Sequence, residues 1–299
     1  MARGRPAPPR GPLTARGTAG RFAIVAPMIH GTGTDEDGCF VREGSLERVP
    51  ARFAPVVAGL GDRLGAHFGP ERLHSSYLYG SIPRGTGVPG VSDLDVLLAL
   101  RTEPTEADRA AARAVEESLD GAFPQIDGAG LLLFSAARVL SEPERHDLGW
   151  FVACLCTPLG GPDLAARLPR YRPTSLLARE TNGDLFRDLP RLRERAAAAT
   201  TEAERTRLTR ALTRRLVRTG FTLVMPRWGG WTSDLAESAE VFGRYYPAWA
   251  GPMRAAADAA RRPAAHPELL DELLAGLAPW LAGEYLAVHG PKTPRPQDG

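Results

Sequence analysis

The sequence is almost without lysine: of its 37 basic residues, only Lys292 is a lysine and the rest are arginines. A Walker-type phosphate loop requires a lysine after its glycines, and Schiff-base chemistry requires a lysine amine. Both are therefore excluded for the folded part of the chain. Basic functions there must rely on arginine, whose planar fork of N–H donors suits carboxylates and phosphates.

Cysteine, long apolar runs and excess charge are also scarce. The three cysteines (Cys39, Cys154 and Cys156) leave one unpaired and make no disulfide framework, so we expect the last two to be core thiols. The early apolar run 22–29 is too short to cross a membrane, so we expect a cytoplasmic protein without a membrane partner. A net charge of +2 does not favour nucleic acid as a partner.

The stretch from Gly80 to Leu100 is the most informative part of the chain. Gly80 and Ser81 end a short strand, a loop rich in glycine and proline follows, and a second strand begins at Ser92. Side chains alternate along a strand, so Asp93 and Asp95 share one face. Two parallel carboxylates repel each other but bind hard divalent cations well. The pattern therefore indicates a metal site.

These residues resemble the nucleotidyltransferase superfamily, which includes DNA polymerase β-like enzymes and aminoglycoside-type enzymes that act on small molecules. The family pattern is an apolar residue, Gly and Ser or Gly, then a connecting loop, then Asp, an apolar residue and Asp or Glu. The resemblance implies that the aspartates hold two Mg²⁺ ions and that the turn binds the nucleotide. The matching metal residues are Asp93 and Asp95, and the matching nucleotide-binding residues are Gly80, Ser81, Arg84 and Ser92. The alternative is a hairpin whose aspartates only keep an edge soluble.

The resemblance also implies a third catalytic and metal-binding carboxylate on the next strand of the sheet. That strand, predicted at 131–134, contains no acidic residue, and Asp127 is the nearest acid before it. A strand beginning at Ile126 would bring Asp127 beside the aspartate pair. The alternative is that Asp127 and Gly128 simply form a turn, as such pairs usually do.

The first half of the chain has the pattern of a small α+β domain. We expect helices at 51–68 and 105–119, the second with Thr105 as its cap, between strands at 77–79, 92–100, 131–134 and 150–157. Gly161-Pro162-Asp163-Leu164 would close the domain, with Asp163 as a possible helix cap. We predict a disordered arm at 1–20 and a nucleotidyltransferase domain with a small mixed sheet at 21–172.

The second half is predicted to be an all-helical bundle domain at 173–289, with a loose tail at 290–299. One stripe of the amphipathic helix 205–218 is leucine, and the opposite stripe is arginine: Arg207, Arg210, Arg214 and Arg218. Those arginines either form a solvated face or include one or two that reach the nucleotide. Thr219 and Gly220 are predicted to end or kink this helix. Thr232 or Ser233 would cap the next one, and a single last helix would run over 267–285.

We therefore expect a metal-dependent nucleotidyltransferase that moves AMP, or another NMP group, from a nucleoside triphosphate such as ATP to a hydroxyl of a small molecule. Aminoglycoside-type antibiotics are one candidate acceptor class. A toxin–antitoxin-type enzyme that modifies protein or tRNA would use the same motif. A non-catalytic nucleotide-binding protein is the third possibility, because no acid lies within the strand predicted at 131–134.

Overall fold

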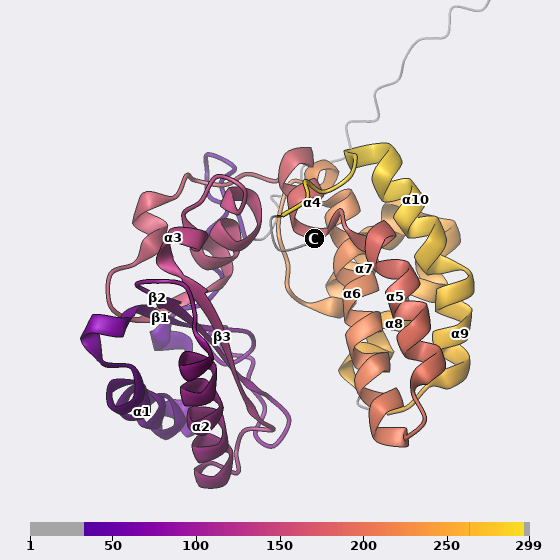
Figure 1. Ribbon diagram of the computed structural model, residues 1–299. Helices are drawn as coiled ribbons and strands as arrows, with labels where there is room; N and C mark the ends of the chain where they lie inside the picture. The colour runs from indigo at the N-terminus through magenta and orange to yellow at the C-terminus, as the bar shows by residue number, and fades with distance from the viewer. Residues whose placement is uncertain (1–32, 263, 296–299) are drawn as a thin grey trace, which may run out of the picture.

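The computed structural model describes residues 33–262 and 264–295, which form a sheet-containing first half and a helical second half (Figure 1). The four strands of these residues make one mixed sheet in the order β3-β2-β1-β4. β1 is antiparallel to β2 and β4, whereas β2 and β3 are parallel. Their bounds are β1 (Leu73–Tyr79), β2 (Leu94–Leu100), β3 (Ala129–Ser135) and β4 (Thr157–Gly160). The predicted α+β class, with a helical C-terminal region, is confirmed.

Two helices, α1 (Ala54–Arg72) and α2 (Glu106–Ala122), lie along one face of the sheet (Figure 1). α2 begins where predicted: the Thr105 hydroxyl accepts the Asp108 N–H, and the Asp108 carboxylate accepts the Thr105 N–H. This reciprocal cap satisfies two backbone donors that have no partner within the helix. Alternate residues of β2 are fully buried beneath the two helices: Leu94, Val96, Leu98 and Leu100.

The segment predicted as the fourth strand, 150–157, is mostly helical, and that prediction is wrong. Arg145–Gly149 and Phe151–Leu155 form π-helical turns, and β4 begins only at Thr157. A short apolar run does not distinguish a strand from a helix, because a fully buried strand and a fully buried helical segment are both apolar at every position. Val152 of this segment packs against Tyr77 and Leu97 on the second face of the sheet.

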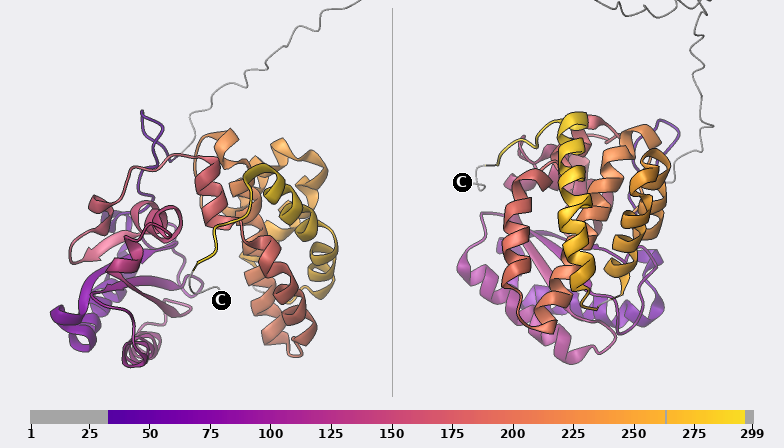
Figure 2. Two further views of the ribbon diagram at one scale, coloured as in Figure 1. Left: turned by 45° about the horizontal axis from the view of Figure 1, so that its top comes forward. Right: turned by 90° about the vertical axis from the view of Figure 1, so that its right-hand side faces the viewer.

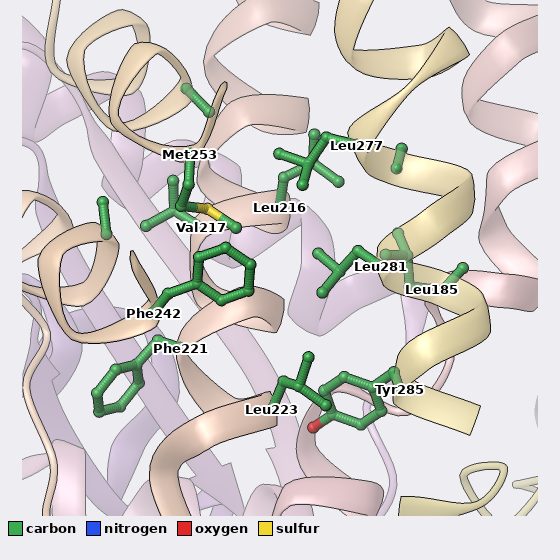
Figure 3. Close-up of a cluster of buried hydrophobic side chains, with 14 of the residues drawn as sticks. Leu185, Leu216, Val217, Phe221, Leu223, Phe242, Met253, Leu277, Leu281 and Tyr285 are labelled. Atoms are coloured by element: carbon green, nitrogen blue, oxygen red, sulfur yellow. The ribbon is translucent and has the colours of Figure 1, made fainter. Parts of the chain in front are cut away.

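The second half is helical throughout, as predicted, and α6 runs through its centre (Figures 1 and 2). Its helices are α4 (Ser175–Asn182), α5 (Leu185–Ala198), α6 (Glu202–Trp228), α7 (Leu235–Tyr245), α8 (Ala250–Arg261), α9 (Pro267–Ala275) and α10 (Leu277–His289). Figure 3 shows part of the shared core, in which Leu216 and Phe221 of α6 gather with Phe242 of α7, Met253 of α8 and Leu281 of α10.

Three predicted helix boundaries are wrong. α6 continues through Gly220 to Trp228. A Cβ at position 220 would collide with Met253, so this glycine allows close packing and does not end the helix. α7 is capped by Asp234, which accepts the Glu237 N–H, and not by the two hydroxyl residues before it. The predicted last helix is two helices separated at Gly276.

The segment 290–295, predicted as part of a loose tail, is packed between the two halves. Lys292, with a side chain only 10% exposed, pairs with Asp147 of the first half at 2.6 Å and with Asp184 of the second at 3.3 Å. Arg295 lies 3.6 Å from Glu144 and 3.1 Å from Glu180 in the same arrangement. These ion pairs were not predicted, because a single charged residue in a Pro-rich segment does not indicate which distant residue it will pair with.

Aromatic residues also join the halves. Trp231, in the turn after α6, makes edge-to-face contacts with Phe40 and Trp150 of the first half and with Phe221 of α6. Trp231 therefore packs in the core between the halves. All three cysteines are buried free thiols, and burial raises the pKa of Cys154 to about 12.

The predicted arm at 1–20 and the apolar run at 22–29 lie outside the described residues. In the part of the chain that the structure describes, no helix is both long enough and apolar enough to span a membrane.

Candidate functional site

The two aspartates of the motif lie at the start of β2. Asp95 is the second residue of the strand, and its partner across the antiparallel ladder is Tyr79, the last residue of β1. Leu94 is fully buried toward α1 and α2, whereas Asp93 and Asp95 are only half-buried. Strand alternation therefore places both carboxylates on the face opposite those two helices, as predicted.

The Gly80–Ser81 turn lies directly against this pair. Gly80 has φ +82°, and a Cβ there would collide with the carboxylate of Asp95, so position 80 requires a glycine for two reasons. The Ser81 hydroxyl donates to the Ser92 hydroxyl oxygen at 3.0 Å, and that same oxygen accepts the Val88 N–H at 2.9 Å. The loop is thus closed onto the start of β2, and the predicted residues Gly80, Ser81 and Ser92 lie together.

Asp95 has an unusual protonation equilibrium. Burial, followed by the charge of Asp93, raises the pKa of Asp95 to about 6. The positive charges of Arg214, Arg218 and Arg210 oppose this rise. A bound cation would favour the ionised carboxylate and would therefore lower the pKa of Asp95 again.

The arginines that influence Asp95 come from one face of α6. Arg210, Arg214 and Arg218 recur every four residues and so line one side of the helix. Nη2 of Arg210 lies 3.2 Å from Oδ2 of Asp93. Arg218 keeps contact with solvent, while surrounding protein and the charge of Arg84 lower its pKa. Arg207, the fourth arginine of the predicted stripe, is exposed.

Arg84, the remaining predicted nucleotide-binding residue, connects the turn to a cavity. Its Nη1 lies 3.6 Å from Oε2 of Glu43, which also accepts the Ser233 hydroxyl at 2.8 Å. The cavity has a volume of about 580 Å³. Residues from both halves line it, among them Arg48, Arg84, Thr86, Trp231, Asp234 and Glu237. Sequence reasoning did not find Glu43, because it belongs to no motif and both partners of its side chain are distant in the sequence.

Asp127, the predicted third carboxylate, precedes β3 rather than lying within it. Its N–H donates to the Ser92 carbonyl, its side chain is exposed, and its Oδ2 lies 3.9 Å from Nη1 of Arg210. β3 starts at Ala129 and not at Ile126, so the register that would have brought Asp127 into the sheet is absent from the described residues. The position opposite Asp95 in β3 is Gly130.

The donor set can be compared with what Mg²⁺ requires. Among residues 33–262 and 264–295, no group of three or more His, Cys, Asp or Glu side chains is arranged to hold a metal ion. Asp93 and Asp95 nevertheless provide hard oxygen donors, and Mg²⁺ sites commonly use one or two carboxylates completed by substrate phosphates and water. The residues therefore fit one ion that binds together with a phosphate ligand better than two ions.

In comparisons with known proteins, no protein-family model and no curated protein matches this sequence.

Proposed function

We propose that this protein is a metal-dependent nucleotidyltransferase that moves AMP, or another NMP group, from a nucleoside triphosphate to a hydroxyl of a small molecule. One observation carries the proposal: the Gly80–Ser81 turn, the Asp93–Asp95 pair and the arginine face of α6 converge at the start of β2. A mixed sheet whose β1–β2 connection carries the turn is consistent with a nucleotidyltransferase core.

Each group has a role in this proposal. The backbone N–H groups of the turn, the Ser81 hydroxyl and the guanidinium groups of Arg84, Arg214 and Arg218 bind phosphate oxygens through charge-assisted hydrogen bonds. Asp93 and Asp95 would hold Mg²⁺, which would offset negative charge on the transferred nucleotidyl group and on the leaving pyrophosphate. The acceptor hydroxyl oxygen forms a bond to the α-phosphorus while the bond from that phosphorus to pyrophosphate breaks, and the hydroxyl proton passes to water or to the departing pyrophosphate.

The cavity beside Arg84 is the space available for the acceptor or for the far end of the nucleotide. It lies next to the turn and is lined from both halves, as ligand sites between two parts of a chain often are. The acceptor is a small molecule in this proposal, since a volume of about 580 Å³ is within the usual range of small-molecule sites.

A second candidate function is nucleotide binding without transfer. It is favoured by Gly130, which lies opposite Asp95 in β3 and offers no side chain that could take the proton of an acceptor hydroxyl. Under this alternative the same residues bind the nucleotide and the metal, and the cavity serves another ligand.

The experiment that separates these functions is a pyrophosphate-release screen with Mg²⁺, each common nucleoside triphosphate and a panel of hydroxylated small molecules. A transferase releases pyrophosphate with at least one pair, and Asp93→Asn abolishes that release. Nucleotide binding in a thermal-shift titration without release for any acceptor supports the second candidate. No stabilisation by any nucleotide would contradict both.

A further inference from the structure

Arg210 occupies the position at which a cation would bind to Asp93. Its guanidinium lies 3.2 Å from Asp93 and 3.9 Å from Asp127, so it bridges two carboxylates that come from the segments preceding β2 and β3. The Arg210 side chain is 28% exposed and that of Asp93 is 33% exposed, so both remain within reach of a ligand from solvent. The ion pair also joins α6 to the first half of the molecule.

A guanidinium and a divalent cation cannot share Asp93 in this arrangement. A bound Mg²⁺ lies about 2.0–2.6 Å from its carboxylate oxygens, which would bring two positive groups into near contact if Arg210 stayed. Phosphate is the other preferred partner of a guanidinium, which binds it through two parallel N–H donors. Arg210 can therefore leave Asp93 at little cost only when a phosphate takes the place of the carboxylate.

The charges of the site favour the same exchange. Asp93, Asp95, Asp127 and Glu43 lie among Arg210, Arg214, Arg218 and Arg84, so negative and positive groups are equal in number when the carboxylates are ionised. A metal ion alone adds uncompensated positive charge beside these arginines. A metal ion together with a triphosphate adds net negative charge, which the arginines stabilise.

We propose that Arg210 is a positioning residue that exchanges partners: it holds Asp93 in the ligand-free protein and binds a nucleotide phosphate once the metal is present. The inference rests on the proposed nucleotide site, but not on transfer. Its consequence is that metal and nucleotide bind cooperatively. The bare metal binds weakly because it must displace Arg210, and the nucleotide supplies the alternative partner.

The test compares Arg210→Gln with wild type and with Arg207→Gln, a control at an exposed position about one turn before Arg210 in the same helix. Binding of Mn²⁺ alone is measured by titration calorimetry, and binding of α,β-methylene-ATP with Mg²⁺ is measured separately. Arg210→Gln should bind bare Mn²⁺ about tenfold more tightly than wild type and the nucleotide about tenfold more weakly. Arg207→Gln should change neither affinity.

A purely structural role for Arg210 would weaken or leave unchanged the binding of bare Mn²⁺, and either result overturns the inference. If Arg210→Gln does not fold, wild type alone decides: equal Mn²⁺ affinity with and without the nucleotide analogue contradicts the exchange. The proposed function fails separately, when wild type binds no nucleotide. If wild type binds nucleotide while Arg210→Gln leaves Mn²⁺ affinity unmoved, only the exchange is refuted.

Discussion

At the scale of single residues, the contact between Gly80 and Asp95 is the most demanding feature of the site. Gly80 has φ +82°, and its missing side chain leaves room for the Asp95 carboxylate. Gly90, in the same loop, has φ +70°, and no atom of the described residues lies within 4 Å of the place that a Cβ would take there. Both positions therefore require a residue that tolerates a positive φ, and only position 80 also lacks room for a Cβ.

This difference gives a matched pair of variants. Gly80→Ala and Gly90→Ala should each lower the free energy of unfolding by about 1–2 kcal/mol, because a left-handed backbone disfavours a side chain. Only Gly80→Ala should also abolish binding of Mg²⁺ with ATP, since its methyl group displaces the Asp95 carboxylate. Urea denaturation and nucleotide titration check the two effects, and equal binding by both variants would contradict this account of position 80.

Asp95 predicts a pH dependence of stability. Its pKa in the folded protein is about 6, above the ordinary value of 3.8, so the folded state retains this proton over a range in which the unfolded state has lost it. The free energy of unfolding should therefore fall as pH rises from about 4 to 6 and stay low above that range. This contribution is destabilising at neutral pH.

Asp95→Asn should remove the effect. In metal-free buffer at pH 8 the variant should be more stable than wild type by about 1–3 kcal/mol, and at pH 4 the difference should vanish. Urea denaturation at both pH values measures it. The exposed Asp62→Asn is the control and should show no such change between the two pH values. A difference that persists at pH 4 would have another cause.

Much of the candidate site was predictable at this scale, because its central residues are close in sequence. Gly80, Ser81, Ser92, Asp93 and Asp95 lie within one strand–loop–strand segment, and the alternation of β2 fixes which way the aspartates face. Their roles in binding and transfer stay predictions. The environment of Arg84 was not predictable, because Glu43 approaches it through folding of a separate segment.

At the scale of elements, α6 contributes to both the core of the helical half and the candidate site. Its leucines pack inward, while Arg210, Arg214 and Arg218 face the aspartates. The leucine and arginine stripes were visible in the sequence. Periodicity shows which residues share a face of a helix, but it does not show which part of the protein that face contacts. Arg218 is the arginine of this face whose charge interacts with both Arg84 and Asp95.

Arg218→Gln should weaken binding of Mg²⁺ with ATP by about tenfold or more, because a charge-assisted hydrogen bond to phosphate contributes about 1.5–3 kcal/mol. Arg207→Gln, about three turns before Arg218 in the same helix, should leave the affinity within error of wild type. Equilibrium titration with a fluorescent ATP analogue measures both. An equal loss in both variants would indicate long-range charge rather than contact.

The elements that sequence patterns missed share a physical reason. The π-helical turns at 145–155 carry an apolar run that serves a buried helix as well as a strand. Gly220 allows Met253 to approach closely and does not end its helix, whereas Gly276 separates α9 from α10. Local propensity does not determine either outcome, because tertiary packing overrides it.

At the scale of the whole molecule, several sets of contacts connect the halves among the described residues. They include the Arg210–Asp93 ion pair, the Glu43–Ser233 hydrogen bond, the aromatic cluster around Trp231 and the ion pairs of Lys292 and Arg295. The last set is the most buried, with side-chain exposures of 10% for Lys292 and 5% for Arg295. Buried charges of this kind are costly when one partner is removed.

Lys292→Met should therefore lower the free energy of unfolding by about 3 kcal/mol, because Asp147 and Asp184 lose their cation. The control is Arg113→Met, which breaks an exposed pair with Glu106 and should cost less than about 1 kcal/mol. Thermal and urea denaturation measure both. A loss for Lys292→Met no larger than that of the control would show that the Lys292 ion pairs do not hold the halves together.

The position of residues 290–295 in the chain also has a consequence for biosynthesis. These residues follow every strand and helix of the described residues, so Lys292 and Arg295 are synthesised long after the sheet-containing half. Domains generally fold as units in the order of their synthesis. The sheet-containing half therefore folds before Asp147 and Glu144 can pair with these cations. The contacts of 290–295 that hold the two halves together form late in folding, when the helical half is also completed.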